Sequence, residues 1–211
     1  MTFLNRRDAG KKLAIALAAY TELPDTVVIG LPRGGVITAF EVAKALHLPL
    51  DIICPRKVGA PDNPELALGA VTHTGEGFFN REIITSLGVS HKYLEEVTAQ
   101  KKKESLHYLK LFRKNRPPLI LKGKTALIID DGLATGATMK AAIQWAKKER
   151  AKKIVVAVPA GPLDTLQELS SIVDDVVCLI SPPFFHAVGQ CYKEFTQTED
   201  AEVIACLENI S

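Results

Sequence analysis

The chain lacks long apolar runs, and it lacks a strong excess of charge of either sign. No stretch reaches the roughly 20 apolar residues that a helix needs to cross a bilayer. The formal net charge is only +2, so bulk charge predicts no strong attraction to nucleic acid or to a membrane surface. We therefore expect no membrane association, and nucleic acid is not the expected partner.

The chain is also poor in the patterns that hold metals or disulfides. Its four cysteines have no CxxC spacing, and three of them stand in or beside apolar runs. The five histidines are scattered and form no HExxH motif, so no dedicated metal cage is predicted. Reduced, buried thiols and a cytoplasmic location are expected instead of a disulfide framework. The cysteines are Cys54, Cys178, Cys191 and Cys206.

The amino-terminal stretch RRDAGKKLAIALAAY has the basic part and the apolar part of a signal peptide. Its apolar part, residues 13–20, is at the lower limit of length for the core of such a peptide. Leu13 and Leu17 fall one helical turn apart, as they do in an amphipathic helix. The pattern favours a first helix over a signal peptide.

The length and composition suit one globular domain over residues 1–211, with 47% hydrophobic and 24% charged residues. Short runs that are apolar throughout alternate with helical patterns, which is typical of a parallel sheet covered on both faces. The predicted fold is α/β, with a doubly wound, mostly parallel sheet and ligand-binding loops after the strands. Strands are predicted at residues 26–30, 50–54, 125–130, 154–158 and 175–180, and a helix at residues 138–150.

Two regions interrupt this alternation. Residues 55–70, PRKVGAPDNPELALGA, hold three prolines and look too irregular for a helix or strand, and too long for a connector. We predict a mobile loop at residues 55–69. A charged helix with one apolar side is predicted at residues 90–114, inside a helical insertion that spans residues 73–118.

The most informative stretch is LIIDDGLATGATMKAA, residues 127–142. An apolar strand ends there in two adjacent acids, Asp130 and Asp131, whose like charges repel. No core needs that arrangement, so the acids are expected to meet the hydroxyls of a phosphosugar and the hydration shell of a Mg²⁺ ion. A glycine-rich turn with a helix cap would explain the loop but neither acid.

The segment after the acids has the composition of a phosphate-binding loop. Gly132 and Gly136 let the backbone approach an anion, and Thr135 and Thr138 add hydroxyl donors. The helix that starts near Thr138 turns free N–H groups and its positive dipole end to the loop. The chain has neither the lysine of a Walker A loop nor a GxGxxG motif, so a pocket for one phosphate group is predicted.

This stretch resembles the 5-phosphoribosyl-1-diphosphate (PRPP) signature of type I phosphoribosyltransferases. The segments GLPRGG, PRKVGAPDNPELALGAV and FFHAVGQCYKEFTQ are similar to segments of an uncharacterised subgroup known only as predicted phosphoribosyltransferases. The likeness covers nearly the whole chain. It implies transfer of the 5-phosphoribosyl group of PRPP to a nitrogenous base or amine, with release of pyrophosphate. It also implies a Mg²⁺ cofactor, held mainly by PRPP, and a homodimer.

The resemblance also implies a role for each loop. Asp130 and Asp131 hold the ribose hydroxyls with Mg²⁺ nearby, and the threonine- and glycine-rich loop holds the 5-phosphate. Arg33 and the glycine amides after it grip pyrophosphate, and Lys57 neutralises the departing pyrophosphate. The predicted catalytic residues are Lys57, Arg33 and Asp131. The predicted substrate contacts are Gly34, Gly35, Arg56, Asp130, Asp131, Gly132, Ala134, Thr135, Gly136, Ala137, Thr138 and Phe185.

The nitrogenous acceptor is expected under a small hood at residues 181–198. Phe184, Phe185 and His186 are stacking candidates, although aromatic residues at such positions are about as often part of a core. Glu65 is a candidate for proton transfer in the mobile loop or simply a solvated acid. Ala134 stands where the 6-oxopurine enzymes of the family carry an acid, so the chain is similar there to the adenine and orotate enzymes.

An alternative from another class is a PRPP- or nucleotide-sensing regulator of the same fold that binds nucleic acid. Arg33, Lys57 and both acids favour the enzyme, because a sensor does not need the lysine of the mobile loop. The run Lys101–Lys103 leaves the regulator open, although a solvated helix face is its simpler interpretation.

Overall fold

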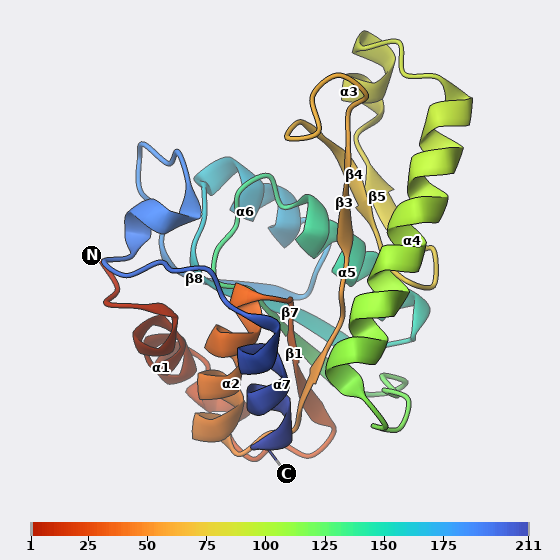
Figure 1. Ribbon diagram of the computed structural model, residues 1–211. Helices are drawn as coiled ribbons and strands as arrows, with labels where there is room; N and C mark the ends of the chain where they lie inside the picture. Colours follow the sequence, from red (N-terminus) through yellow and green to blue (C-terminus); the bar gives the residue numbers. More distant parts are fainter. Residues whose placement is uncertain (1, 211) are drawn as a thin grey trace.

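A five-stranded parallel sheet forms the centre of the computed structural model, which describes residues 2–210 (Figure 1). Its strand order is β2-β1-β6-β7-β8, and each neighbouring pair runs parallel. The predicted doubly wound α/β fold is therefore confirmed. The strands are β1 (Thr26–Gly30), β2 (Leu50–Ile52), β6 (Thr125–Ile129), β7 (Lys153–Ala160) and β8 (Asp175–Ile180).

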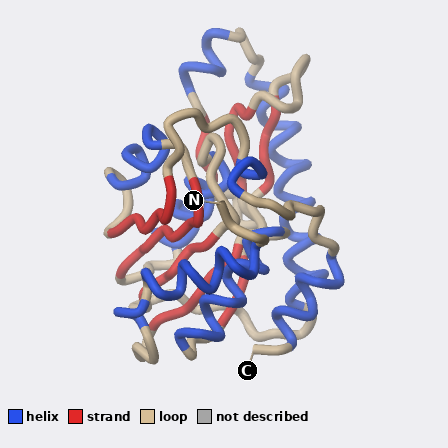
Figure 2. The backbone as a smooth tube through the Cα atoms, turned by 90° about the vertical axis from the view of Figure 1, so that its left-hand side faces the viewer, coloured by secondary structure: helices blue, strands red, loops and turns tan. Residues whose placement is uncertain are grey.

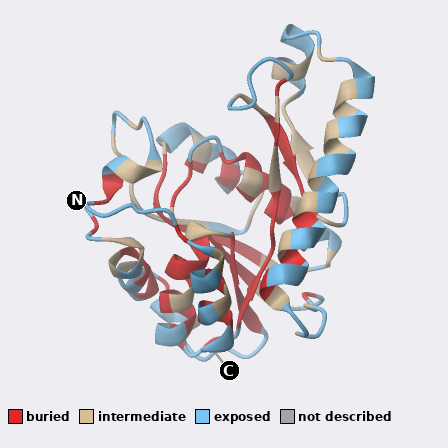
Figure 3. Ribbon diagram, viewed as in Figure 1, coloured by how far each residue is buried: buried red, intermediate tan, exposed pale blue. Residues whose placement is uncertain are grey.

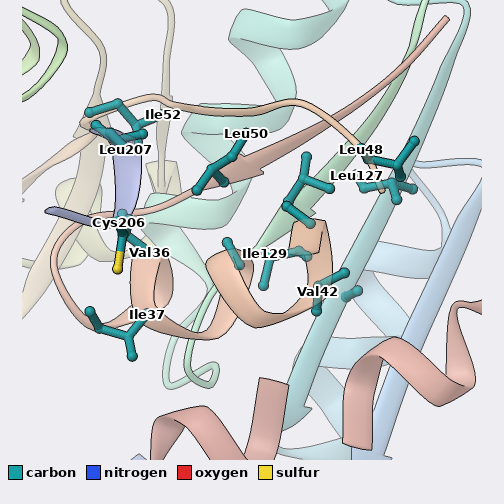
Figure 4. Packing of buried hydrophobic residues seen from close by; sticks show 14 of the residues in the cluster. Val36, Ile37, Val42, Leu48, Leu50, Ile52, Leu127, Ile129, Cys206 and Leu207 are labelled. Atoms are coloured by element: carbon teal, nitrogen blue, oxygen red, sulfur yellow. The ribbon is translucent and has the colours of Figure 1, made fainter. Parts of the chain in front are cut away.

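Helices cover both faces of this sheet because its strands are apolar on both sides. Side chains of one face pack against α1 (Arg6–Ala16), α2 (Gly34–Leu46) and α7 (Asp200–Glu208). Figure 4 shows part of this layer, where Val36 and Val42 of α2 lie near Leu127 and Ile129 of β6. The other face packs against α5 (Ala137–Lys148) and α6 (Leu163–Ser170). Figure 3 shows the buried residues gathered in the sheet and in the helices beside it.

A second, antiparallel sheet of three strands rises beside the large sheet, with strand order β3-β4-β5 (Figure 1). Its strands pack against the long helix α4, where a small apolar cluster joins Val58 and Leu68 to Leu94 and Val97. Loops gather between the two sheets (Figure 2). The elements are β3 (Arg56–Gly59), β4 (Ala67–Val71), β5 (Gly77–Phe79), α3 (Arg81–Ser86) and α4 (His91–Arg113).

The expectation that residues 55–70 form no strand is wrong, since β3 and β4 both lie there. Only the turn at residues 60–66 is irregular. Its prolines make the two short strands beside it difficult to recognise from the sequence. Gly69 is required in β4, because a Cβ at that position would overlap the carbonyl oxygen of Phe78 in β5. The insertion at residues 73–118 likewise contains β5 as well as helices. Mobility of the loop stays a prediction.

The remaining boundaries follow the sequence patterns closely. The strands at residues 26–30 and 175–180 have the predicted ends, whereas β2 ends two residues before the predicted residue 54.

A helix does form at the amino terminus, followed by η1 (Ala18–Tyr20), and Leu13 and Leu17 are buried. Within residues 2–210, no helix has the length and hydropathy needed to span a membrane. The four cysteines are free thiols, and three of them are buried.

Candidate functional site

The loops after β1 and β6 meet at the carboxyl edge of the large sheet. Leu31 N–H donates to the carbonyl of Ile129 at 3.0 Å, so the two loops leave the sheet side by side. A Cβ on Gly34 would overlap the carboxylate of Asp131, and one on Gly35 would stand 2.5 Å from a carboxylate oxygen of the other acid. The predicted pyrophosphate loop and the acid pair are therefore in contact, and the two glycines make that approach possible.

The loop between the acids and α5 has the geometry of an anion cradle. Gly136 is the N-cap of α5 and has a φ of 70°, a conformation that favours glycine. Ala134 and Thr135 are exposed in the loop before it, and Thr138 is half-buried in the first turn of the helix. The N–H groups of that first turn have no acceptor within the helix and point towards the loop. Such a helix start can hold one phosphate group.

The two acids differ in their surroundings. Asp131 N–H donates to Asp130 Oδ1 at 2.8 Å. Burial raises the pKa of the Asp130 carboxyl well above its usual range, and the charge of Asp131 raises it further. Asp130 Oδ2 and Asp131 Oδ1 have no hydrogen-bond partner among the described residues. The pair therefore offers free carboxylate oxygens and gains from added positive charge or hydroxyl donors.

Arg6 is a residue of this site that the sequence patterns did not reveal. Its Nε donates to Asp131 Oδ2 at 2.6 Å, and its Nη1 donates to the carbonyl of Thr196 at 2.6 Å. The guanidinium carbon lies 3.9 Å from the ring centroid of Phe195, a cation–π contact. Arg6 and Asp131 are 125 residues apart in sequence, and Arg6 stands in a basic stretch that looks like an ordinary helix start.

Tyr192 is a second residue that sequence reasoning missed. Its hydroxyl donates to the backbone carbonyl of Asp131 at 2.5 Å. Its ring stacks on Phe195 with centroids 4.9 Å apart and tilts against Phe3 at 5.4 Å. Burial raises the pKa of the Tyr192 hydroxyl, so the group remains a neutral donor. Tyr192 ties the predicted hood segment to the acid pair.

The predicted stacking residues of the hood are distributed differently. Phe184 is 79% exposed and His186 is also exposed. Phe185 is half-buried and packs against the small apolar cluster around Phe3 and Tyr192. The same segment includes the short helix η2 (Val188–Cys191). The contact of Phe185 with a base remains a prediction.

The predicted cations Arg33 and Arg56 gather around one aromatic ring of α4. Their guanidinium carbons lie 5.9 Å and 4.7 Å from the ring centroid of Tyr108. Arg33 Nε is 2.7 Å from a carboxylate oxygen of Asp200, and Arg56 Nε is 3.6 Å from Glu104. The loop after β1, the start of β3 and helix α4 thus converge beside the site.

Lys57 lies on β3 and makes an ion pair within its own loop. Its Nζ is 3.1 Å from Glu65 Oε2 and 3.3 Å from the Glu65 carbonyl oxygen. The Glu65 side chain is 92% exposed. No described hydrogen bond or ion pair joins Lys57 to the acid pair, so its approach to a ligand stays a prediction.

The donor set fits Mg²⁺ better than it fits a transition metal. Asp130 and Asp131 supply carboxylate oxygens, which Mg²⁺ prefers, with free oxygens on both side chains. Among the described residues, no group of three or more histidine, cysteine, aspartate or glutamate side chains could hold an ion. The acids could therefore contribute to a magnesium site in which a ligand supplies most of the oxygens.

The sequence matches a family of known proteins. Residues 5–195 match the phosphoribosyl transferase domain family, so the chain belongs to that family. Two Mycobacterium tuberculosis proteins, from strains CDC 1551 and H37Rv, carry the provisional name phosphoribosyl transferase and are 45% identical to this chain over 206 residues. The match covers 98% of this chain and 46% of each relative. The chain therefore spans about half the length of these curated relatives.

Solved structures are similar to this chain in fold. The protein TT1426 from Thermus thermophilus is 40% identical to this chain, with a TM-score of 0.83 and 100% of both chains covered. A hypoxanthine-guanine phosphoribosyltransferase from Bacillus anthracis is 10% identical, with a TM-score of 0.51. That match covers 92% of this chain and 94% of the other. At such low identity the second likeness concerns the fold alone.

Proposed function

We propose that the protein transfers the 5-phosphoribosyl group of PRPP to a nitrogenous base or amine and releases pyrophosphate. One observation carries this proposal: the acid pair stands between a single-phosphate cradle and the glycine loop of Arg33, at one edge of the sheet. A matching ligand has a pair of hydroxyls with a phosphate at one end and a second anionic group at the other. PRPP has this order of groups.

Each part of the site then has a role in binding PRPP. The start of α5 and the hydroxyls of Thr135 and Thr138 hold the 5-phosphate. The free oxygens of Asp130 and Asp131 accept hydrogen bonds from the ribose hydroxyls. The loop of Gly34 and its neighbours holds pyrophosphate through backbone amides, as closely packed glycines permit.

The chemistry needs little from the protein beyond position and charge. The acceptor nitrogen uses its lone pair to bond C1 of the ribose while the bond from C1 to the pyrophosphate oxygen breaks. Pyrophosphate leaves with the electron pair of that bond, and the acceptor passes a proton to the departing pyrophosphate. The protein lowers the barrier by holding the reactants in line, by stabilising the charge on pyrophosphate and by excluding water.

Lys57 is the residue that we assign to the departing pyrophosphate. Its ion pair with Glu65 is largely open to solvent, and such pairs contribute about 0–1 kcal/mol. Exchanging Glu65 for pyrophosphate therefore costs little. A movement of the turn at residues 60–66 would separate Glu65 from Lys57, which frees the Lys57 ammonium for pyrophosphate, and would cover the site.

Mg²⁺ is the cofactor that we propose, held mainly by PRPP with Asp130 and Asp131 beside it. When bound, it supplies positive charge to the oxygens of the substrate. The raised pKa of Asp130 in the protein alone agrees with a site that gains from such a charge. A homodimer remains a prediction from the resemblance, and a cytoplasmic location remains a prediction from the cysteine pattern.

Ala134 limits the class of acceptor but does not identify a particular base. This residue is exposed in the phosphate loop and carries no titratable group, so it cannot take the acceptor's proton. We therefore propose an acceptor that does not need a carboxylate at this position. The hypoxanthine-guanine enzyme resembles this chain in fold alone, and its substrate is not carried over.

A pyrophosphate-release assay tests the proposed function. PRPP and Mg²⁺ are supplied with a panel of bases and amines, and the double variant Asp130→Asn, Asp131→Asn serves as the blank. We expect at least one acceptor to release pyrophosphate well above the blank. A gel-shift assay with nucleic acid runs in parallel. PRPP-dependent nucleic-acid binding without pyrophosphate release from any acceptor would support the regulator instead.

A further inference from the structure

We propose that Arg6 is a positioning residue of the PRPP site, which holds the Asp131 carboxylate in the orientation that the ribose hydroxyls require. The inference rests on the proposed function. It assigns a binding role to the amino-terminal helix, which lies far from the acid pair in the sequence.

Hydrogen bonds hold the backbone in place on both sides of Arg6 in the sequence. Three backbone hydrogen bonds of 2.8–2.9 Å join residues 3–4 to residues 191–194. The side chain of Asn5 caps α1 by accepting from Asp8 N–H at 3.1 Å. Arg6 is the first residue of the helix after this cap, so its backbone is anchored beside the hood segment.

The guanidinium of Arg6 is then held by three groups. Its two hydrogen bonds reach the Asp131 carboxylate and the Thr196 carbonyl, and its flat face lies on Phe195. The Arg6 and Asp131 side chains are only 13% and 15% exposed. Solvent therefore screens this ion pair less than it screens an ion pair on the surface. The planar guanidinium of Arg6 has donors in fixed directions, so it restricts the rotation of both side chains.

This arrangement uses one carboxylate oxygen and leaves the other free. Arg6 binds Asp131 Oδ2, whereas Oδ1 has no partner among the described residues. Arg6 also supplies positive charge beside two adjacent acids that would otherwise face the anionic PRPP alone. A competing role, in which Arg6 blocks the site until ligand displaces it, predicts the opposite effect of removing the charge.

Arg7 provides a matched control. It is the next residue on α1, and its Nη1 makes an ion pair of 2.7 Å with Glu41 on α2. No described hydrogen bond or ion pair joins Arg7 to the acid pair or to the hood. Removing its charge therefore breaks an ion pair between helices and tests for a general loss of stability.

The experiment measures the Kd of PRPP with Mg²⁺ by calorimetry for wild type, Arg6→Gln, Arg6→Lys and Arg7→Gln. We expect Arg6→Gln to weaken binding by at least about tenfold, and Arg7→Gln to stay within about twofold of wild type. Arg6→Lys should bind more tightly than Arg6→Gln, because it keeps the charge beside Asp131. Phe195→Leu keeps both charges and should weaken binding by less than Arg6→Gln. If Arg6→Gln does not fold, Phe195→Leu binding more weakly than Arg6→Lys counts against the proposal.

The possible results distinguish failure of the proposed function from failure of the role proposed for Arg6. Wild type that does not bind PRPP overturns the proposed function, and with it the role of Arg6. Wild type that binds, with Arg6→Gln equal to it or tighter, overturns the positioning role alone. Equal loss in Arg6→Lys and Arg6→Gln also overturns it, because that result shows a structural contact between Arg6 and the hood that does not depend on charge.

Discussion

The charged residues around the acid pair are bound to other parts of the same chain in the absence of ligand. Asp131 is paired with Arg6, and Arg33 with Asp200. Binding a phosphorylated ligand therefore exchanges some of these partners and also uses the free oxygens of the acid pair. The Arg33–Asp200 pair has side chains that are 36% and 38% exposed, so its exchange should cost about 1 kcal/mol or less.

Lys57 gives the first prediction at the scale of a residue. Lys57→Ala should lower turnover by about a hundred- to a thousandfold, with a much smaller change in PRPP affinity. The reason is that charge on pyrophosphate grows as the bond to C1 breaks, so a positioned cation favours the transition state. Single-turnover kinetics is the measurement, because product release can hide the loss in steady state. Glu65→Gln, which removes only the partner of Lys57, is the control. Equal single-turnover rates for Lys57→Ala and wild type would exclude Lys57 from the mechanism.

Asp130 gives a prediction about stability and pH. Its folded pKa lies above the unfolded value of about 3.9, so the folded state binds more protons between these two values. The free energy of unfolding contributed by this group therefore falls as pH rises through that window. Asp130→Asn should raise the melting temperature at about pH 7 without ligand, and the gain should disappear near pH 4.

Thermal denaturation at several pH values checks this prediction, with Asp131→Asn as a control of opposite sign. Asp131→Asn breaks the ion pair with Arg6 and should lower the melting temperature at neutral pH. A lower melting temperature for Asp130→Asn at neutral pH would show that the Asp130 charge stabilises the fold.

At the scale of elements, the large sheet and the acid loop could be predicted from sequence because their signals are local. Each strand of the parallel sheet is short and mostly apolar, although β2 contains Asp51, and β1 and β8 have the predicted ends. The acids and glycines after β6 are adjacent in sequence, so their chemistry is visible without a structure. The small sheet was missed because its strands are short and are separated by the turn at residues 60–66.

Contacts made by distant segments could not be predicted in the same way. Arg6 and Tyr192 reach the acid pair because backbone hydrogen bonds join residues 3–4 to residues 191–194. Arg33 and Arg56 both lie near the ring of Tyr108 because α4 lies against β3. No local sequence pattern predicts these contacts, because each contact depends on how whole helices, strands and loops pack against one another.

The glycines at the start of α2 give a prediction at this scale. Gly34→Ala should weaken PRPP binding by at least about tenfold, because the new Cβ would overlap Asp131 and Arg6 and displace the loop. Alanine favours a helix over glycine by about 1 kcal/mol, whereas overpacking costs typically about 1–3 kcal/mol. We therefore expect no gain in stability. Calorimetry with PRPP and Mg²⁺ is the measurement.

Gly161→Ala is the matched control for this variant. Its Cβ would stand 3.1 Å from the Leu133 Cβ, a close contact that small shifts can relieve. Binding that survives in Gly34→Ala but is lost in Gly161→Ala would mean that the contact between the glycine loop and the acid pair is unimportant.

At the scale of the whole molecule, the described residues form an α/β domain with both faces of its large sheet covered. The curated relatives are about twice as long, so a domain of this kind is part of larger proteins. The site unites the amino-terminal helix, the loops after β1 and β6, and the segment before α7. Ligand that bridges these parts should stabilise the domain as a whole.

The most direct test of the account is a thermal denaturation series with PRPP and Mg²⁺, compared with ATP and Mg²⁺. A ligand at a hundred times its Kd adds about 2.7 kcal/mol, which corresponds to roughly 5–10 °C in a chain of this size. We predict such a rise with PRPP, and a much smaller one with ATP because the cradle fits one phosphate and has no Walker lysine. The double variant Asp130→Asn, Asp131→Asn should fold and lose the rise. No rise with millimolar PRPP, or an equal rise in the double variant, would contradict a PRPP site at this acid pair.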